Sequence, residues 1–252
     1  MSADGGRRYS FSYSQAVGCN RFSGGLTSPS MTEADFVRAT RESYDTMAGY
    51  YAQWIRDELA ARPVDRALLA GFAELVQEAD VGPIADIGCG PGRVTAHLNG
   101  LGVPVFGIDL SPQMVAQARR VHPDLRFDVG SMLALDLPDR SLGGIVTWYS
   151  IIHIPDEELP RAFVEFGRVL APGGYVLAAF QVGDEVTHRA EAAGHPVSLD
   201  FYLRRPSKVA AMLDQAGFVV QAQALREPDG GGRFAEKTQQ GFVLAGKPRS
   251  VA

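Results

Sequence analysis

The chain has 252 residues, of which 46% are hydrophobic, 21% charged and 9% aromatic. This is the composition of a globular protein, and at this length one α/β core removes about 70–75% of the unfolded chain's surface from water. The formal net charge of −5 argues against a nucleic-acid partner. The apolar stretches are far shorter than the roughly 20 residues of a membrane-spanning helix, which argues against a membrane partner.

The two cysteines, Cys19 and Cys89, lie far apart in the sequence, and no zinc-type spacing is present. This pattern is typical of a reduced protein rather than a disulfide scaffold. The sequence therefore predicts a cytoplasmic protein without a metal site, and it leaves the oligomeric state open.

Residues 1–30 are rich in Ser and Gly and show no hydrophobic period. Two interpretations stay open: a flexible leader, or a chain whose translation begins at Met31. Residues 31–252 are predicted to form one domain.

Helical periodicity dominates the first part of that domain. Between Glu33 and about Ala61, apolar and aromatic residues recur at spacings of three and four, and a second helix follows Pro63, with Asp65 as its candidate N-cap. Gly82 and Pro83 stop this second helix. The pattern predicts a helical cap over residues 33–80.

Beyond Pro83 the chain alternates short apolar runs with helical patterns. Strands are expected at 84–87, 103–108, 125–129, 144–147 and 175–180, and helices at 94–98, 112–120 and 157–170. Asp156 is the candidate N-cap of the last of these helices. A parallel sheet with helices on both faces follows from this alternation.

The C-terminal part predicts one more helix, capped by Ser207, and then two strands at 218–225 and 238–244 joined through a glycine-rich turn. The segment 181–205 is too long for a simple connection and is predicted to be a lid insert. The fold class is α/β: a doubly wound seven-stranded sheet, mostly parallel with one antiparallel strand from the C-terminal hairpin, and an N-terminal helical cap.

A glycine cluster follows the first strand and precedes a helix, in the segment Asp86-Ile87-Gly88-Cys89-Gly90-Pro91-Gly92-Arg93. Glycines let the backbone approach a ligand closely, and a carboxylate at the strand end can accept hydrogen bonds from an ammonium group. The segment resembles motif I of the class I S-adenosylmethionine-dependent methyltransferases. A dinucleotide fingerprint, G-x-G-x-x-G, would need a third glycine where Arg93 stands.

Asp109 ends the second strand, where a carboxylate can hold both hydroxyls of a ribose. Enzymes that bind a nicotinamide dinucleotide also place a ribose-binding carboxylate at this strand end. Asp109 alone therefore does not distinguish them from other nucleoside-binding proteins. Leu110 and Met114 can flank an adenine ring, with core packing as the alternative. Ser111 before Pro112 is N-cap chemistry.

The third strand leads into Gly130-Ser131-Met132. In the family that this sequence resembles, the residue beside the adenine is often Asp; Ser131 takes that position here, and its hydroxyl can pair with the adenine amine. The turn at 168–174 resembles the family's helix-to-fifth-strand turn. The resemblance covers residues 84–180.

Upstream, Tyr44, Ala48 and Tyr51 share one helical face in a pattern that resembles the entry helix of many small-molecule methyltransferases. The resemblance implies that a tyrosine hydroxyl, Tyr51 in our assignment, reaches the carboxylate of the cofactor; a buried core tyrosine is the alternative.

Four residues after the fourth strand are expected near the transferred methyl group, because ligands bind beyond the carboxyl ends of parallel strands. Trp148 and Tyr149 can form an aromatic wall, and His153 can act as a general base, with a structural histidine as the alternative. Ser150 lies between them. No Asn-Pro-Pro-Tyr-like element of DNA and protein-amide methyltransferases is present, which favours a small acceptor.

The resemblance implies an S-adenosylmethionine-dependent methyltransferase that moves a methyl group in line to a small-molecule O or N acceptor, a secondary metabolite among the options. Two alternatives stay open. One is a protein that binds the cofactor without methylating, in a regulatory or cyclase-like role. The less favoured one is an NAD-dependent oxidoreductase.

Overall fold

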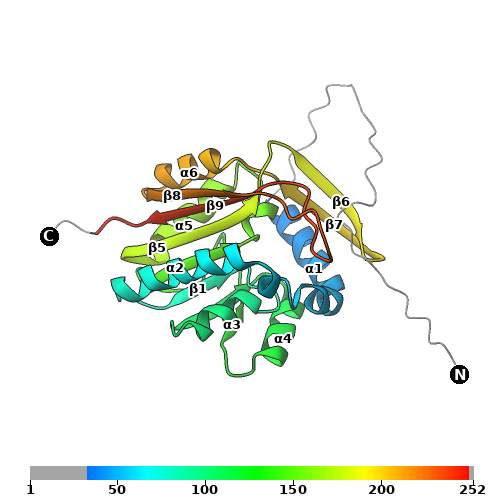
Figure 1. The fold of residues 1–252 in the computed structure, drawn as a ribbon, viewed down its shortest axis with the longest axis horizontal. Coiled ribbons are helices and arrows are strands. Elements are labelled where there is room, and N and C mark those ends of the chain that lie inside the picture. Colours follow the sequence, from blue (N-terminus) through cyan, green and yellow to red (C-terminus); the bar gives the residue numbers. More distant parts are fainter. Residues whose placement is uncertain (1–32, 250–252) are drawn as a thin grey trace, which may run out of the picture.

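A seven-stranded sheet forms the centre of the protein (Figure 1). The computed structural model describes residues 33–249, so the predicted leader and the alternative start at Met31 lie outside it. The strand order is β3-β2-β1-β4-β5-β9-β8. The strands are β1 (Ile84–Ile87), β2 (Val105–Asp109), β3 (Phe127–Val129), β4 (Leu142–Trp148), β5 (Leu170–Gln181), β8 (Val219–Arg226) and β9 (Gln240–Gly246).

Strand directions confirm the predicted fold class. The pairs from β3 to β5 are all parallel, whereas β9 runs antiparallel to both of its neighbours, β5 and β8. One antiparallel strand therefore stands in an otherwise parallel sheet, as the C-terminal hairpin predicted. The carboxyl ends of β1, β2 and β4 meet at one edge of this sheet, because parallel neighbours end on the same side.

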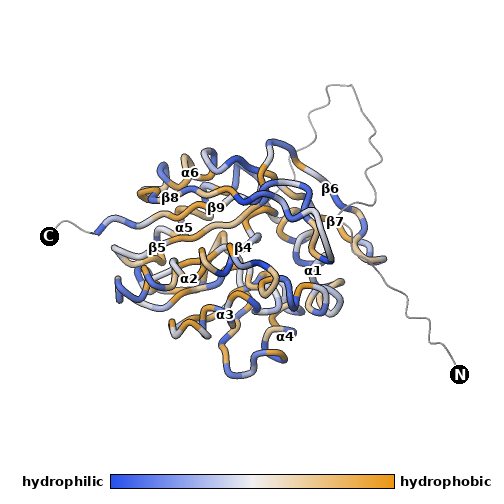
Figure 2. The backbone as a smooth tube through the Cα atoms, viewed as in Figure 1, coloured by the Kyte–Doolittle hydropathy of each residue, from blue (hydrophilic) through white to orange (hydrophobic). Residues whose placement is uncertain are grey.

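Helices cover both faces of the sheet (Figure 1). They are α1 (Glu33–Ile55), α2 (Pro63–Ala79), α3 (Arg93–Gly100), α4 (Pro112–Val121), α5 (Leu159–Val169) and α6 (Pro206–Gln215), with short 3-10 turns η1 (Leu59–Ala61) and η2 (Ile151–His153). Apolar residues concentrate along the central strands and polar residues on the outer loops (Figure 2).

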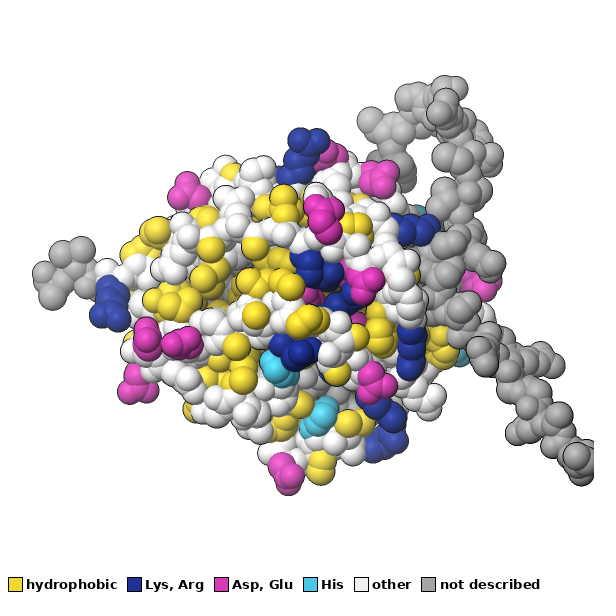
Figure 3. All heavy atoms as spheres, viewed as in Figure 1, with side chains coloured by type: hydrophobic (Ala, Val, Ile, Leu, Met, Phe, Trp, Pro, Cys, Tyr) yellow, Lys and Arg dark blue, Asp and Glu magenta, His cyan; other side chains and the backbone are white. Residues whose placement is uncertain are grey.

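Charged side chains of both signs are interspersed on the face shown in Figure 3, where no broad positive patch is visible. Within residues 33–249, none of the helices combines the length and the apolar content needed to span a bilayer.

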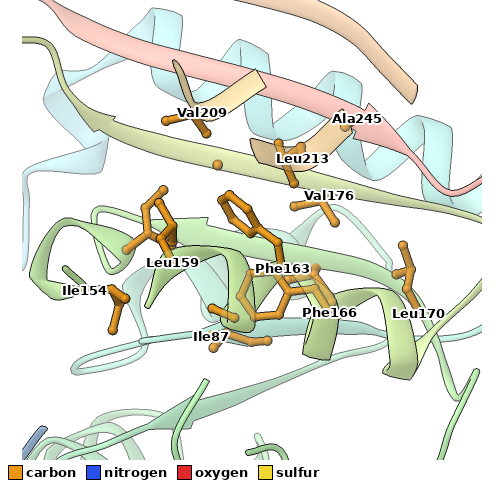
Figure 4. Packing of buried hydrophobic residues seen from close by; sticks show 14 of the residues in the cluster. Ile87, Ile154, Leu159, Phe163, Phe166, Leu170, Val176, Val209, Leu213 and Ala245 are labelled. Carbon is orange, nitrogen blue, oxygen red and sulfur yellow. The ribbon is translucent and has the colours of Figure 1, made fainter. Parts of the chain in front are cut away.

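Two apolar clusters lie on opposite faces of the sheet. The larger one packs α5 and α6 against the strands and contains Phe163 and Phe166 (Figure 4). The other packs α2 and α3 and contains Phe72. Neighbouring residues of β4, Ile145 and Val146, point into different clusters, as the two-residue period of a strand requires. Each buried aromatic or branched side chain contributes about 1.5–3 kcal/mol.

Two predicted helix caps are wrong for the same reason. Helix α2 begins at Pro63 and α6 at Pro206, so Asp65 and Ser207 lie inside the first turn instead of at the N-cap. Proline favours the first helical position, because it has no N–H to leave unpaired and its φ is already helical. The predicted cap at Ser111 is confirmed, since its Oγ accepts from Met114 N at 3.0 Å.

The cap predicted at Asp156 is also wrong. Helix α5 begins at Leu159, and the Asp156 carboxylate instead accepts from Arg204 Nε at 2.7 Å and pairs with Lys208. These cations favour the ionised carboxylate and lower the pKa of Asp156, although its partial burial opposes the shift.

The predicted start of the fifth strand shifts as well. Strand β5 begins at Leu170 rather than Tyr175, because Leu170 pairs with Leu142 across a register shift before regular pairing resumes at Tyr175.

A separate two-stranded sheet lies in the segment where an insertion was predicted. It consists of β6 (Val186–Ala192) and β7 (His195–Tyr202), which pair antiparallel. Ala192, Val197 and Leu199 from this hairpin form a small apolar cluster with Met47 of α1. The hairpin and α1 therefore support each other beside the main sheet (Figure 1).

Candidate active site

A cavity of about 940 Å³, counted out to its solvent-open mouth, lies at the carboxyl ends of β1, β2 and β4 and under α1. Every site residue that the sequence singled out lines it: Tyr51, Asp86, Gly88, Cys89, Gly90, Asp109, Leu110, Met114, Gly130, Ser131, Met132, Trp148, Tyr149 and His153. The structure therefore brings together residues from four strand ends, from helices α1 and α4 and from the 3-10 turn η2.

Two glycines shape the loop between β1 and α3. Gly88 has a φ of +78°, and a Cβ at this position would lie 2.2 Å from Ser150 Cβ, so only glycine fits. Gly90 has a φ of +54°, and its Cβ would meet no atom closer than Tyr51 Cε1 at 3.9 Å. Gly88 N and Cys89 N donate to Ile108 O at 2.7 and 3.1 Å. The loop is thus fixed to β2 and exposes its backbone to the cavity.

Asp86 carries one oxygen without a partner. Its Oδ2 accepts from Thr95 Oγ1 at 2.6 Å, whereas Oδ1 is buried and has no hydrogen-bond partner among the described residues. Burial raises the pKa of Asp86 to about 6, although the hydrogen bond from Thr95 and the charge of Arg93 oppose this shift. A ligand cation at Oδ1 would satisfy this oxygen and favour the ionised form.

Asp109 is oriented by the backbone. Its Oδ2 accepts from Gly90 N at 2.7 Å and its Oδ1 from Ser111 N at 2.8 Å. Burial raises the pKa of Asp109 to about 6, against the two N–H bonds that lower it. Each carboxylate oxygen has two acceptor positions, so both can still accept from a ribose hydroxyl.

Residues at and after the ends of β2 and β3 line another part of the cavity. Leu110 and Met114 line it, and Gly130 follows β3, where a Cβ would lie 2.9 Å from Ile108 Cγ2. Ser131 Oγ accepts from Leu133 N at 3.3 Å, which leaves its hydroxyl hydrogen for a ligand. This part combines two apolar side chains with one hydroxyl, which suits a heteroaromatic ring that carries an amine.

On the opposite wall, His153 lies between α1 and β7. Its Nδ1 is 2.8 Å from Asp200 O, and its Nε2 is 2.8 Å from Tyr44 Oη. Because a carbonyl only accepts, Nδ1 carries the hydrogen, and Nε2 accepts from the Tyr44 hydroxyl. Burial lowers the pKa of His153 to about 4, so the ring is neutral at pH 7. Both nitrogens are engaged, and direct base catalysis requires the Tyr44 pair to separate.

Tyr149 has an unusual backbone. Its φ is +58°, and its N donates to Ala179 O at 3.0 Å. Its hydroxyl is buried without a hydrogen-bond partner among the described residues, and burial raises its pKa well above 10. The Trp148 ring packs edge-on at 5.9 Å between centroids. A backbone held in this region is typical of functional positions.

Other residues of the site carried weaker sequence signals. Asp45 Oδ1 accepts from Ser111 Oγ at 2.6 Å and Gln113 N at 3.1 Å, which fixes α1 to the start of α4. Thr95 and Arg93 follow the glycine cluster, and this adjacency is the signal that could have identified them. The backbone carbonyl of Asp200 carries no sequence signal, because every residue has a backbone carbonyl.

Burial raises the pKa of the Cys89 thiol, so it is not a thiolate nucleophile at neutral pH. Among residues 33–249, no cluster of three or more His, Cys, Asp or Glu side chains is arranged to hold a metal ion.

The residues of this cavity fit S-adenosylmethionine. The unpartnered Asp86 oxygen suits its ammonium, the oriented Asp109 carboxylate its ribose, and the open backbone at Gly90 the close approach of its amino-acid end. A second phosphorylated nucleotide, as in a nicotinamide dinucleotide, would need a third glycine at Arg93.

Comparisons with known proteins agree with this fit. Residues 84–174 match the family model described as "Methyltransferase domain". The chain is 33% identical over 116 residues to malonyl-[acyl-carrier protein] O-methyltransferase of Erwinia billingiae (strain Eb661), covering 46% of this chain and 45% of that protein. It is 33% identical over 151 residues to trans-aconitate 2-methyltransferase of Rhizobium meliloti (strain 1021), covering 56% of this chain and 52% of that protein. The chain thus spans about half the length of these curated relatives.

Solved structures share the fold at low identity. The DhpI–SAH complex superposes with a TM-score of 0.66 at 21% identity, covering 86% of this chain and all of that one (100%). Magnesium protoporphyrin IX methyltransferase (ChlM) from Synechocystis PCC 6803 with bound SAM superposes with a TM-score of 0.61 at 14% identity, covering 88% of this chain and 100% of that chain. Residues 84–174, which include the glycine loop, are therefore similar to the methyltransferase domain of the class I S-adenosylmethionine-dependent methyltransferases. The solved structures share the fold of the chain.

Proposed function

We propose that the protein transfers a methyl group from S-adenosylmethionine to a small-molecule acceptor and releases S-adenosylhomocysteine. The observation that carries this proposal is one cavity that holds the glycine loop, the unpartnered Asp86 oxygen and the oriented Asp109 carboxylate. Asp86 takes the ammonium of the cofactor and Asp109 its ribose hydroxyls. Leu110 and Met114 flank the adenine, and Ser131 pairs with its amine.

The cofactor supplies a methyl group already activated on a sulfonium, so the protein must mainly align the acceptor and exclude water. We assign this task to the helical cap over residues 33–80 and the insert over 181–205. Four aromatic side chains line the cavity: Tyr44 and Tyr51 from the cap, and Trp148 and Tyr149 from the end of β4. Tyr44 donates to His153 Nε2, which joins α1 to the residues after β4 at this side of the cavity.

Names of curated relatives support a small acceptor that is methylated at O or N. One is named for the O-methylation of malonyl-[acyl-carrier protein], one is named for trans-aconitate, and a third is norajmaline N-methyltransferase from Rauvolfia serpentina, 34% identical over 127 residues. A cytoplasmic location stays a prediction from the cysteine usage.

Two measurements test this proposal. Titration calorimetry should detect binding of S-adenosylhomocysteine and no binding of NADH; the reverse result would establish the oxidoreductase alternative. Incubation with cofactor labelled on its methyl carbon, and a panel of small carboxylic acids, phenols and amines, should then give labelled product. Tight cofactor binding with no labelled product from any acceptor would favour the protein that binds without methylating.

A further inference from the structure

A hydrogen bond between Tyr44 and His153 lies in the wall of the cavity, and both side chains line it. Tyr44 comes from α1, and His153 comes from η2, the turn that follows β4. The Tyr44 Oη lies 2.8 Å from His153 Nε2, and the other ring nitrogen, Nδ1, lies 2.8 Å from Asp200 O. Since a carbonyl only accepts, the ring hydrogen is on Nδ1 and Nε2 accepts from Tyr44. These groups form a hydrogen-bonded chain from the cavity wall to the backbone of β7.

The other titratable groups of the cavity are less able to take a proton from an acceptor. Burial raises the pKa of the Cys89 thiol and of the Tyr149 hydroxyl, so both keep their hydrogens at neutral pH. Arginine side chains are already protonated. The two carboxylates, Asp86 and Asp109, hold the cofactor in the function proposed above. Among the described residues that line the cavity, His153 is therefore the base left for the acceptor.

His153 is neutral at pH 7, and charges of both signs surround it. Its pKa is lowered to about 4, mainly by burial and also by the charges of Arg189 and Arg204, whereas the Asp200 carbonyl and carboxylate oppose this shift. The ring therefore has an unprotonated Nε2 before any reaction. When a proton arrives there, the two groups of Asp200 stabilise the imidazolium that forms.

Both partners of this pair are held by other contacts. Arg204, which is fully buried, donates from Nη1 to Ile151 O at 3.0 Å and also donates to the carbonyl of Ile154, which fixes the two ends of η2. On α1, the residue before the tyrosine is Ser43, whose Oγ accepts from Ser198 N of β7 at 2.8 Å. The pair is therefore in position before a ligand binds, and such preorganisation favours proton transfer inside the cavity.

We infer that Tyr44 and His153 form a proton relay for the methyl acceptor: the acceptor's hydrogen passes to the Tyr44 oxygen while the Tyr44 hydrogen passes to His153 Nε2. A hydroxyl can donate its own hydrogen and accept another, so the relay does not require the pair to separate. The inference rests on the proposed function and deepens it, because it also names the acceptor class.

That class is a phenol. A carboxylate is already ionised at pH 7, and a neutral amine attacks with its own lone pair, so neither needs a base before it reacts. A phenol keeps its hydrogen at pH 7, since its pKa is about 10, and gains from a relay. Its ring also suits the aromatic side chains that line the cavity, among them Trp148 and Tyr149.

The step balances in atoms and in charge. The phenol oxygen forms a bond to the methyl carbon, the methyl–sulfur bond breaks, and its electron pair stays on sulfur. One positive charge leaves the sulfur and one appears on the His153 ring, so the net charge of the cavity is unchanged. This compensation offsets part of the cost of protonating a buried ring. The proton returns through Tyr44 to water when the products leave.

The first test compares a phenol with a nitrophenol, which ionises near neutral pH because the nitro group withdraws electrons. Tyr44→Phe and His153→Gln should each lower the methylation rate of the phenol by roughly 10- to 100-fold, the low end for acid–base catalysis, because a base of low pKa takes a proton less readily. Methylation of the ionised nitrophenol should fall by less than about threefold, since it has no hydrogen to give. An equal loss with both acceptors would overturn the relay and make the pair structural.

The double variant separates a relay from two independent effects. It should be no slower than either single variant, because each of them already removes the whole relay. Retained phenol turnover in Tyr44→Phe, together with its loss in His153→Gln, would overturn the relay and make His153 a direct base. Tyr50→Phe is the matched control: Tyr50 lies on the same helix, its ring is 6.3 Å from that of His195 of β7, and it does not line the cavity. This variant should keep the wild-type rates.

Nitrogen NMR of the histidine rings gives a readout that needs no turnover. At pH 7 the wild type should show His153 with its hydrogen on Nδ1, and His153→Gln assigns the signal by removing it. Tyr44→Phe should shift the Nε2 resonance of His153, because it removes the donor, and Tyr50→Phe should leave it in place. A hydrogen on Nε2 at pH 7 would overturn the relay, and this measurement decides if Tyr44→Phe or the double variant does not fold.

The labelling panel of carboxylic acids, phenols and amines distinguishes the failure of the relay from the failure of the proposed function. Labelled product from a phenol supports the relay. Product from carboxylic acids or amines but from no phenol would overturn the relay and leave the proposed function standing. No product from any acceptor with the wild-type protein would refute the proposed methyl transfer, and the relay with it.

Discussion

The two walls of the cavity are built in different ways. On the loop wall, the hydrogen bonds join residues close in sequence: Thr95 to Asp86 at a separation of 9 residues and Gly90 to Asp109 at 19. On the cap wall they join distant segments: Tyr44 to His153 at a separation of 109 residues, and His153 to Asp200 at 47. The loop wall is thus a local motif, whereas the cap wall exists only once the whole chain has folded.

This difference assigns different tasks to the two walls. A local motif with fixed backbone contacts suits a ligand that does not change, such as a cofactor. Long-range contacts through single hydrogen bonds can be broken at low cost, since each contributes about 0.5–1.5 kcal/mol net. We expect substitutions on the loop wall to change binding and folding most, and substitutions on the cap wall to change turnover.

Gly88→Ala should have the largest effect on stability, because it adds a side chain where the loop wall packs most tightly. The new Cβ would lie 2.2 Å from Ser150 Cβ, at a φ of +78° that disfavours side chains. Overpacking and backbone strain together should lower the free energy of unfolding by about 3 kcal/mol or more. Urea denaturation measures this loss.

Gly71→Ala is the control for that measurement. Gly71 lies inside α2, and no atom lies within 4 Å of a Cβ built there. This exchange should raise stability by about 0.5–1 kcal/mol through helix propensity. Equal effects at the two glycines would contradict the tight packing of Gly88 against Ser150.

The loop wall should also give the protein a pH dependence through Asp86. Its folded-state pKa is raised from 3.8 to about 6, so the folded state holds the proton more tightly than the unfolded state. Stability is therefore lost as the pH rises from about 4 through 6, by roughly 2–3 kcal/mol. Melting curves from pH 4 to 7 should show that the wild type loses this much stability relative to Asp86→Asn as the pH rises.

Saturating S-adenosylhomocysteine should shrink that divergence, because an ammonium beside Asp86 favours its ionised form. Asp128→Asn, at a half-buried carboxylate of β3 that pairs with Arg126 and lies outside the cavity, is the matched control for the same exchange. Parallel stability curves for the wild type and Asp86→Asn would contradict the buried, unpartnered carboxylate.

The same contrast explains what the sequence could predict. The strand directions and the position of the glycine loop follow from local patterns, and so does the Ser111 cap, which acts three residues away. The cap predicted at Asp156 is wrong for a reason that no local pattern shows, since its carboxylate pairs with Arg204, 48 residues later. Likewise, the sequence singled out His153, but not that Tyr44 and the Asp200 carbonyl occupy both of its nitrogens.

Asp109→Ala tests the ribose contact on the loop wall. The exchange removes an acceptor that Gly90 N and Ser111 N already orient, so affinity for S-adenosylhomocysteine should fall by about 2 kcal/mol, or roughly 30-fold. Calorimetry measures this change, with Asp128→Ala as a control that leaves affinity intact. An unchanged dissociation constant would remove Asp109 from the cofactor site.

Tyr44→Phe is the smallest change and tests the cap wall. It removes the hydroxyl that donates to His153 Nε2 and leaves that nitrogen buried without a donor, which should lower the free energy of unfolding by about 1 kcal/mol. Affinity for S-adenosylhomocysteine should stay within about threefold of wild type, while turnover of an identified acceptor falls, because the cap wall loses the hydrogen bond that joins α1 to His153. Tyr175→Phe, on β5 and outside the cavity, is the control. If Tyr44→Phe instead weakened cofactor binding and left turnover intact, the two walls would not divide binding and turnover between them.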